Sequence, residues 1–156
     1  SVTLKGTVAG TAAVKAQASA GASSVNVALT PDGSTAKVVD LTATPATIVA
    51  NGTATSNLVA TVEDANGNPV ANAAVSWSTS TGTLSAASSS TDANGKASVT
   101  LKGTVAGTAT VKAQASAGAS SADVELTPDG STAKVMDLTA TPASIVANGT
   151  ATSNLV

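Results

Sequence analysis

Apolar and polar residues alternate along much of this chain. In the stretch SNLVATVED, Leu58, Ala60 and Val62 fall on one side of an extended backbone, and the residues between them fall on the other. The same alternation runs through AAVSWSTST, KASVTLK, TATVKAQAS and SADVELT. Because strand side chains point to the two faces in turn, this pattern predicts half-buried antiparallel strands. A helix is the weaker alternative, since no stretch keeps apolar residues at i, i+3, i+4 and i+7.

Turn-forming residues separate these stretches. Asp-Ala-Asn-Gly occurs twice, at residues 64–67 and 92–95, and Asn51-Gly52 marks another reversal. Asn and Gly supply the positive φ that hairpin loops need, and Asp accepts hydrogen bonds from the amides that follow it. About seven strands result, a number typical of an immunoglobulin-like antiparallel β-sandwich. They are expected to pass through Leu41, Val62, Trp77, Leu84, Leu101, Val111 and Val124.

The chain contains an internal repeat of 97 residues. The opening phrase SVTLKGTVAGT returns at Ser98, and residues 1–59 match residues 98–156 with six mismatches. A period of this length indicates tandem domains. We therefore expect residues 34–130 to form a complete unit. Residues 1–33 are predicted to be the last strands of a preceding unit, and residues 131–156 the first strands of a following one, as in an internal segment of a longer array.

The mismatches between the two copies test which strand face is buried. Asn26 is replaced by Asp123 and Ala28 by Glu125, and both positions belong to the face predicted to meet water. On the opposite face an apolar residue stays apolar, because Val25 is replaced by Ala122. This distribution favours sheets with one buried and one solvated face.

The order of the strands predicts an extended shape. An odd number of up-and-down passes places the entry and exit of the chain at opposite ends of a unit. Only about seven residues, Pro31 to Lys37, separate the last strand of one unit from the first strand of the next. This linker is too short to be a flexible tether. We expect a rod whose joints bend only to a limited extent.

The composition excludes several classes of function. The chain has no Cys, His, Phe, Tyr or Arg, and seven Lys face nine acidic residues. Disulfides, thiolate chemistry and an imidazole base are therefore excluded. Without Arg and with one aromatic residue, no nucleic-acid surface is expected. No apolar run approaches the roughly 20 residues that span a bilayer, so no membrane contact is expected. We predict that the segment is not an enzyme and needs no cofactor.

Several separated motifs resemble one family. LTATPATIVANGTATSNLVATVEDANGNPVANAAVSWSTSTGTLS (residues 41–85) and TDANGKASVTLKGTVAGTATVKA (residues 91–113) carry its elements in order. These are an early Pro and Asn-Gly-Thr, a V-x-D-x-x-G-x-P-V turn, a V-x-W strand, a T-D-x-x-G-x-A turn and an A-G-x-x-x-V-x-A strand. The repeat resembles the group 1 bacterial immunoglobulin-like domains of invasin and intimin. The resemblance implies an extracellular bacterial surface protein in which arrays of such domains form a stalk.

Two groups of residues are candidates for calcium. Asp64, Asn66 and Asn68 have the i, i+2, i+4 oxygen spacing that opens a calcium loop, but Val75 stands where such a loop needs its twelfth-position Glu. A hairpin turn is the favoured interpretation. The second group flanks the linkers, where similar giant adhesins use acidic side chains to bind calcium, although solvated turns are favoured here. Its members are Asp32, Asp40, Asp129 and Asp137.

Three further features have an ordinary structural interpretation. Trp77 lies in the inward phase of its strand and is predicted to be a core residue. Glu63 is adjacent to Asp64, so the two side chains point to opposite faces and do not form an acid–base pair. Asn51 and Asn148 stand in Asn-Gly-Thr sequons and are interpreted as turn residues and not as glycan acceptors.

These observations lead to a structural hypothesis. The segment is expected to be part of the stalk of a long, repetitive surface or secreted adhesin, with neighbouring repeats of the same chain as its partners. The alternative is a binding module, or a fibre subunit that pairs with other copies, through strand edges and loop tips. For a stalk, contact with a host or cell surface would be made by other modules of the protein. The scarcity of Tyr, Trp and Arg argues against the alternative, since these residues anchor most interfaces.

Overall fold

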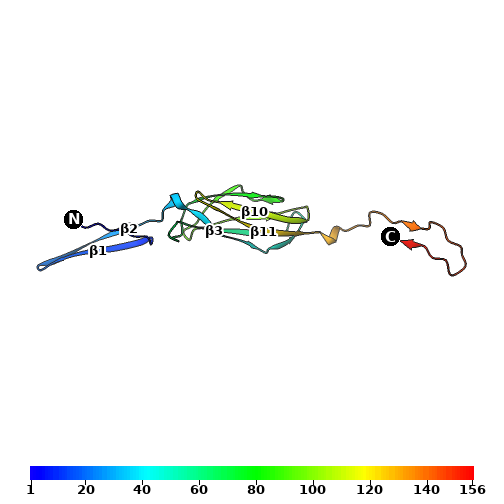
Figure 1. The fold of residues 1–156 in the computed structure, drawn as a ribbon, viewed down its shortest axis with the longest axis horizontal. Helices are drawn as coiled ribbons and strands as arrows, with labels where there is room; N and C mark the ends of the chain where they lie inside the picture. The colour runs from blue at the N-terminus through cyan, green and yellow to red at the C-terminus, as the bar shows by residue number, and fades with distance from the viewer.

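The computed structural model describes residues 1–156 and shows an elongated all-β molecule (Figure 1). A compact sandwich occupies the middle, and the two flanking segments leave it at opposite ends. The only helices are two short 3-10 turns, η1 (Gly33–Thr35) and η2 (Gly130–Thr132). Neither has the length or the apolar character that a membrane-crossing helix requires. The predicted fold class, an immunoglobulin-like antiparallel sandwich, is confirmed.

The sandwich consists of two sheets. One sheet has the order β3-β5-β9-β7 and contains β3 (Lys37–Thr44), β5 (Ser56–Glu63), β9 (Lys96–Lys102) and β7 (Thr83–Leu84). The other has the order β4-β11-β10-β6-β8 and contains β4 (Thr47–Val49), β11 (Ala119–Thr127), β10 (Gly107–Gln114), β6 (Ala74–Thr79) and β8 (Ser88–Ser90). Every neighbouring pair is antiparallel except β4 and β11.

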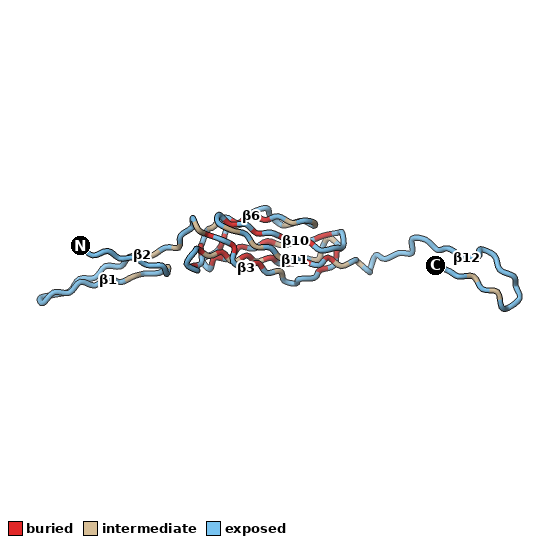
Figure 2. The backbone as a smooth tube through the Cα atoms, in the orientation of Figure 1, coloured by how far each residue is buried: buried red, intermediate tan, exposed pale blue.

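The core lies entirely between these two sheets (Figure 2). Leu58, Ala60 and Val62 of β5 are fully buried, whereas the residues between them are not, so the predicted alternation is confirmed. Asp123 and Glu125 of β11 are exposed, in agreement with the face that the repeat mismatches indicate. The core contains many Ala and Val side chains, which each bury little area. Its stability therefore depends on a few larger residues.

Trp77 is part of this core. Its side chain is 5% exposed, and its indole Nε1–H donates a hydrogen bond to Ser89 Oγ at 2.9 Å. The predicted core role is confirmed. Because this is the chain's one Trp, its fluorescence reports on the folding of the sandwich and not of the flanks.

The structure adds two strands that the sequence pattern did not predict. Strand β4 follows Pro45, where the chain leaves the first sheet and joins the second beside β11. Strand β8 consists of three Ser residues that pair with β6. Three residues are too few to establish an alternation, and a run of Ser carries no apolar signal. Both strands form because their backbone groups pair with a longer neighbouring strand, β11 for β4 and β6 for β8.

The flanks reproduce parts of the sandwich at the 97-residue offset. Strands β1 (Gly10–Ala18) and β2 (Gly21–Leu29) form a hairpin in which Gly10 pairs with Leu29, as Gly107 pairs with Leu126 between β10 and β11. Strands β12 (Ala140–Thr141) and β13 (Asn154–Leu155) pair Ala140 with Leu155. The corresponding residues of β3 and β5 pair in the same register. The repeat therefore determines local pairing even where no sandwich closes.

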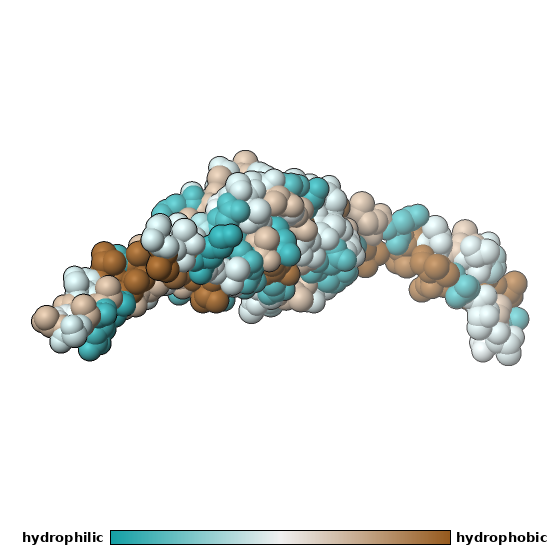
Figure 3. Space-filling model, turned by 60° about the vertical axis from the view of Figure 1, so that its left-hand side comes forward, coloured by the Kyte–Doolittle hydropathy of each residue, from teal (hydrophilic) through white to brown (hydrophobic).

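Large apolar side chains are exposed mainly on the flanks, which Figure 3 shows as brown surface on both arms. Leu4 is 48% exposed, but its counterpart Leu101 is fully buried. Leu155 is 64% exposed, but its counterpart Leu58 is fully buried. These two flank positions are thus core positions of the repeat that lack their opposing sheet in this segment, whereas Val8 and its counterpart Val105 are both exposed.

Candidate functional site

The most constrained polar site lies where the N-terminal hairpin meets the sandwich. It is centred on Asp64, a residue in the turn after β5 that is 2% exposed. Asp64 Oδ1 accepts the backbone N–H groups of Asn66 at 2.8 Å and Asn68 at 2.9 Å. An Asp at the start of a tight turn forms this arrangement with its own backbone. The turn's own backbone therefore orients the carboxylate.

Asn68 connects this turn to the N-terminal flank. Its side-chain oxygen accepts the N–H of Ala9 at 2.7 Å, and its Nδ2 donates to the carbonyl of Thr7 at 2.8 Å. The same Nδ2 donates to Asp64 Oδ2 at 2.9 Å. The side-chain amide thus pairs with the backbone on both sides of Val8, as a residue of a neighbouring strand would, and both N–H groups of Nδ2 are used.

Two further hydrogen bonds complete this contact. The backbone N–H of Asp32 donates to Asp64 Oδ2 at 3.1 Å, and the N–H of Ala65 donates to Thr35 Oγ1 at 3.1 Å. We call these two bonds, together with the two that connect the Asn68 side chain with Thr7 and Ala9, the joint. The joint binds the hairpin and its linker to one end of the sandwich. Its chemistry is recognition of backbone groups, and it contains no nucleophile or proton-transfer pair.

The electrostatics of Asp64 follow from these contacts. The hydrogen bond from the Asn68 side chain, with those from the surrounding backbone N–H groups, lowers the pKa of Asp64 to about 2, against the opposing effect of burial. Hydrogen bonds from Ser34 similarly lower the pKa of Asp32, and those from Ser131 lower the pKa of Asp129. Asp64 is therefore a permanent acceptor at neutral pH.

We expect the joint to weaken in acid. The unfolded chain titrates Asp near 3.9, so the contribution of Asp64 to the folded state is complete above about pH 4. It is lost as the pH falls toward 2, because a protonated carboxyl accepts these hydrogen bonds poorly. A carbon-13 NMR titration of the Asp64 carboxyl should give a midpoint near pH 2. In the Asn68→Ala variant the midpoint should rise toward the ordinary value, and an ordinary midpoint in the unmodified chain would contradict the assigned contacts.

The structure brings together only some of the calcium candidates. Asp32 lies beside Asp64, whereas Asn66 is exposed and its side chain makes no hydrogen bond. Asp40 is exposed on β3 and Asp137 in the C-terminal flank. Nowhere do three or more His, Cys, Asp or Glu side chains form a group suited to a metal. Asp32 and Asp129 cap η1 and η2 by accepting the N–H and hydroxyl of Ser34 and Ser131. These contacts agree with the turn interpretation favoured for both groups, and calcium binding at them is not tested.

The twin turn provides an internal comparison. Asp92 accepts the backbone N–H groups of Asn94 at 2.8 Å and Lys96 at 2.9 Å, which matches the turn at Asp64. Asp92 makes no hydrogen bond to the flanks, and Lys96 stands where the other turn has Asn68. That difference between two otherwise identical turns is the signal in the sequence that marks the joint. The partners of Asn68 are the Thr7 carbonyl and the Ala9 N–H. No sequence pattern could identify them, since nearly every residue carries these two backbone groups.

The Asn-Gly-Thr sequons form turns, as expected. The Asn51 side-chain oxygen accepts the N–H groups of Thr53 and Ala54 at 2.9 and 2.8 Å. Asn148 makes the same bonds to Thr150 and Ala151. Each Asn therefore stabilises its local reversal through its own backbone neighbours.

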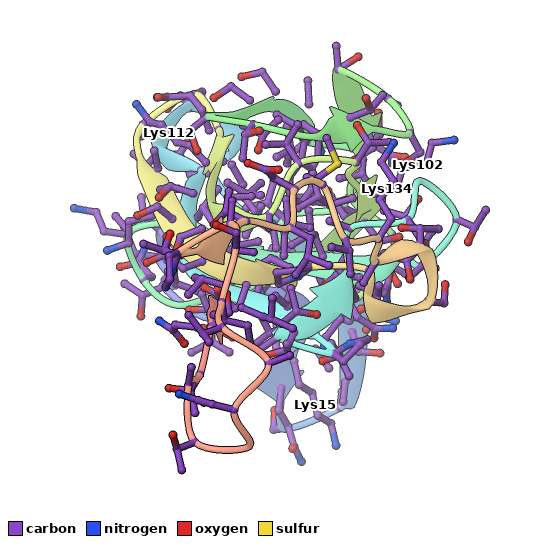
Figure 4. The ribbon with its side chains drawn as sticks, turned by 90° about the vertical axis from the view of Figure 1, so that its right-hand side faces the viewer. Lys15, Lys102, Lys112 and Lys134 are labelled. Atoms are coloured by element: carbon purple, nitrogen blue, oxygen red, sulfur yellow. The ribbon has the colours of Figure 1, made fainter.

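Equivalent Lys side chains of the repeat lie on different sides of the molecule. Figure 4, viewed along the long axis, shows Lys15 and Lys112 pointing to different sides of the molecule. These two residues are counterparts in the repeat, on β1 and β10. Successive hairpins are therefore rotated about the long axis, and equivalent side chains do not form a continuous stripe.

Comparison with known proteins agrees with this architecture. Residues 38–127 match the family described as bacterial Ig-like domain (group 1). The chain is 41% identical over 147 residues to the inverse autotransporter adhesin YeeJ of Escherichia coli (strain K12). The match covers 88% of this chain and 6% of that protein, so the chain spans a small fraction of this relative.

Solved structures show the same fold. The D00-D0 domain of intimin has 29% identity and a TM-score of 0.56, covering 69% of this chain and 56% of that one. Invasin, a bacterial integrin-binding protein, has 27% identity and a TM-score of 0.61, covering 94% of this chain and 31% of that one. These relatives are bacterial adhesins, and the expected extracellular location at the bacterial surface agrees with them.

Proposed function

The chain belongs to the group 1 bacterial immunoglobulin-like domain family, and from this premise we propose that it is a stalk segment of a bacterial adhesin. Its task is mechanical: it holds other parts of the protein at a distance from the cell. The observation that carries the proposal is the exit of the chain at opposite ends of the sandwich (Figure 1). Units with this geometry extend in one direction when they are linked in tandem.

The flanks support the division into units at residues 33/34 and 130/131. Exposed apolar side chains such as Leu4 and Leu155 correspond to buried positions of the central sandwich, and the pairing registers of the flanks are those of the repeat. We therefore assign residues 1–33 to a preceding unit and residues 131–156 to a following one. The neighbouring repeats supply the opposing sheets that cover these side chains.

A receptor-binding role for this segment has less support. One intimin structure was determined with the translocated intimin receptor, and invasin is described as integrin-binding. This chain offers no comparable anchor, because its one aromatic side chain is buried and it has no Arg. Aromatic and Arg side chains supply most of the binding free energy at interfaces. No constellation suited to catalysis is present either, so we assign no enzymatic role.

The experiment that tests the stalk compares chains with one, two and three complete units by small-angle X-ray scattering. The maximum dimension should grow by a constant increment, roughly 30 Å for the nine-residue strands plus the length of the linker. Freely jointed units would instead give increments that shrink as units are added. That result would exclude a stiff spacer.

A further inference from the structure

The C-terminal end of the sandwich repeats the three backbone groups and the Thr hydroxyl that the joint uses at the N-terminal end. At the 97-residue offset, Thr7, Ala9, Asp32 and Thr35 correspond to Thr104, Ala106, Asp129 and Thr132. We propose that these four residues form a docking surface for the Asp64-to-Asn68 turn of a second copy of this repeat. The proposal rests on the proposed stalk and specifies how its units connect.

The four groups have free hydrogen-bonding capacity. The N–H groups of Ala106 and Asp129 and the carbonyl of Thr104 make no hydrogen bond within the chain. The Thr132 hydroxyl donates to the Asp129 carbonyl at 3.1 Å, as Thr35 donates to Asp32 at 3.1 Å, and its oxygen still has room to accept. At the N-terminal end all four counterparts are paired with the turn.

The docking surface already has the required backbone shape. Gly10 and Gly107, which follow the bracketed segments, have φ values of +152° and +141°. Asp32 has φ −84° and ψ 94°, and Asp129 has φ −78° and ψ 93°. Strands β10 and β11 continue in the register of β1 and β2. Docking therefore requires little rearrangement, which lowers its entropic cost.

The chemistry selects one kind of partner. The surface needs a carboxylate that accepts the Asp129 N–H and, four residues later, an amide that pairs with both Thr104 and Ala106. The turn at Asp64 has this pair, whereas the twin turn carries Lys96, which donates hydrogen bonds and accepts none. The partner is therefore a copy of the same repeat. The contact joins unlike ends, so it generates an open row and not a closed dimer.

The first test uses the present chain and measures amide hydrogen exchange by NMR. Ala9 and Ala106 stand in the same sequence, Gly-Thr-Val-Ala-Gly-Thr, so their intrinsic rates are closely matched. We expect Ala9 to exchange at least about tenfold more slowly than Ala106, because only Ala9 is hydrogen-bonded to Asn68. Asn68→Ala should remove this difference, and Asn66→Ala, which changes an exposed side chain of the same turn, should preserve it. Equal rates in the unmodified chain would overturn the proposal.

The second test extends the chain by the residues that complete the following unit. The Ala106 amide should then become protected to the level of Ala9. Alanine at the Asn68 counterpart of the added unit should abolish the protection of the Ala106 amide. As a control, Asp92→Asn, in the twin turn of the present sandwich, should leave that protection unchanged. Persistent fast exchange of Ala106 in the extended chain would overturn the docking surface. The scattering increments test the stalk separately, so either conclusion can fail without the other.

Discussion

Replacing Leu58 with alanine should lower the free energy of unfolding of the sandwich by about 2–5 kcal/mol. Leu58 is fully buried in β5, which pairs with β3 on one side and β9 on the other. Truncation removes buried apolar area and leaves a cavity. The pairing of β5 with β3 and β9 limits the backbone movement that could close this cavity. Because the core is rich in Ala and Val, few side chains can expand to fill it. The loss is large beside the 5–15 kcal/mol of a typical domain.

The repeat provides a matched control for this substitution. Leu155 is the counterpart of Leu58 in the C-terminal flank and is 64% exposed. Leu155→Ala should change the unfolding free energy by less than about 0.5 kcal/mol. Urea denaturation followed by Trp77 fluorescence measures both variants, since Trp77 lies in the sandwich. Equal effects of the two substitutions would mean that the assigned core is wrong.

Replacing Gly95 with alanine should destabilise the sandwich by about 2–4 kcal/mol. Gly95 has φ +72°, a conformation that is unfavourable for any residue with a Cβ atom. A Cβ atom there would also lie 2.5 Å from the Val62 carbonyl oxygen. That backbone has little freedom to move, because the Val62 N–H donates to the Gly95 carbonyl at 2.8 Å.

Gly67, at the same position of the twin turn, separates the two causes. Its φ is +81°, but a Cβ atom would meet nothing nearer than Glu63 Oε2 at 3.9 Å. Gly67→Ala should therefore cost only the backbone conformation, about 1–2 kcal/mol. Thermal unfolding of the two variants gives the comparison. If Gly67→Ala lowered the stability of the sandwich as much as Gly95→Ala, the close approach to the Val62 carbonyl would contribute nothing to the loss.

The polar joint shows where inference from sequence reached its limit. The spacing of Asp64, Asn66 and Asn68 identified the correct turn, but the chemistry suggested for it was a calcium loop or a simple hairpin. In the structure Asp64 and Asn68 bind backbone groups of the preceding segment. The partners of Asn68 are about sixty residues away and are ordinary main-chain atoms. A pattern of residue types carries no information about such partners.

The sequence by itself determined the longer strands, their buried faces, the turns and the repeat. These properties are local, because an extended backbone directs successive side chains to opposite faces. The hydrophobic effect then buries the apolar face. The tertiary structure alone decided the rest. Strands β4 and β8, the crossing at Pro45 and the contacts of Asn68 exist because distant backbone groups meet in space. Every residue has those groups, so only the closed fold determines which of them pair.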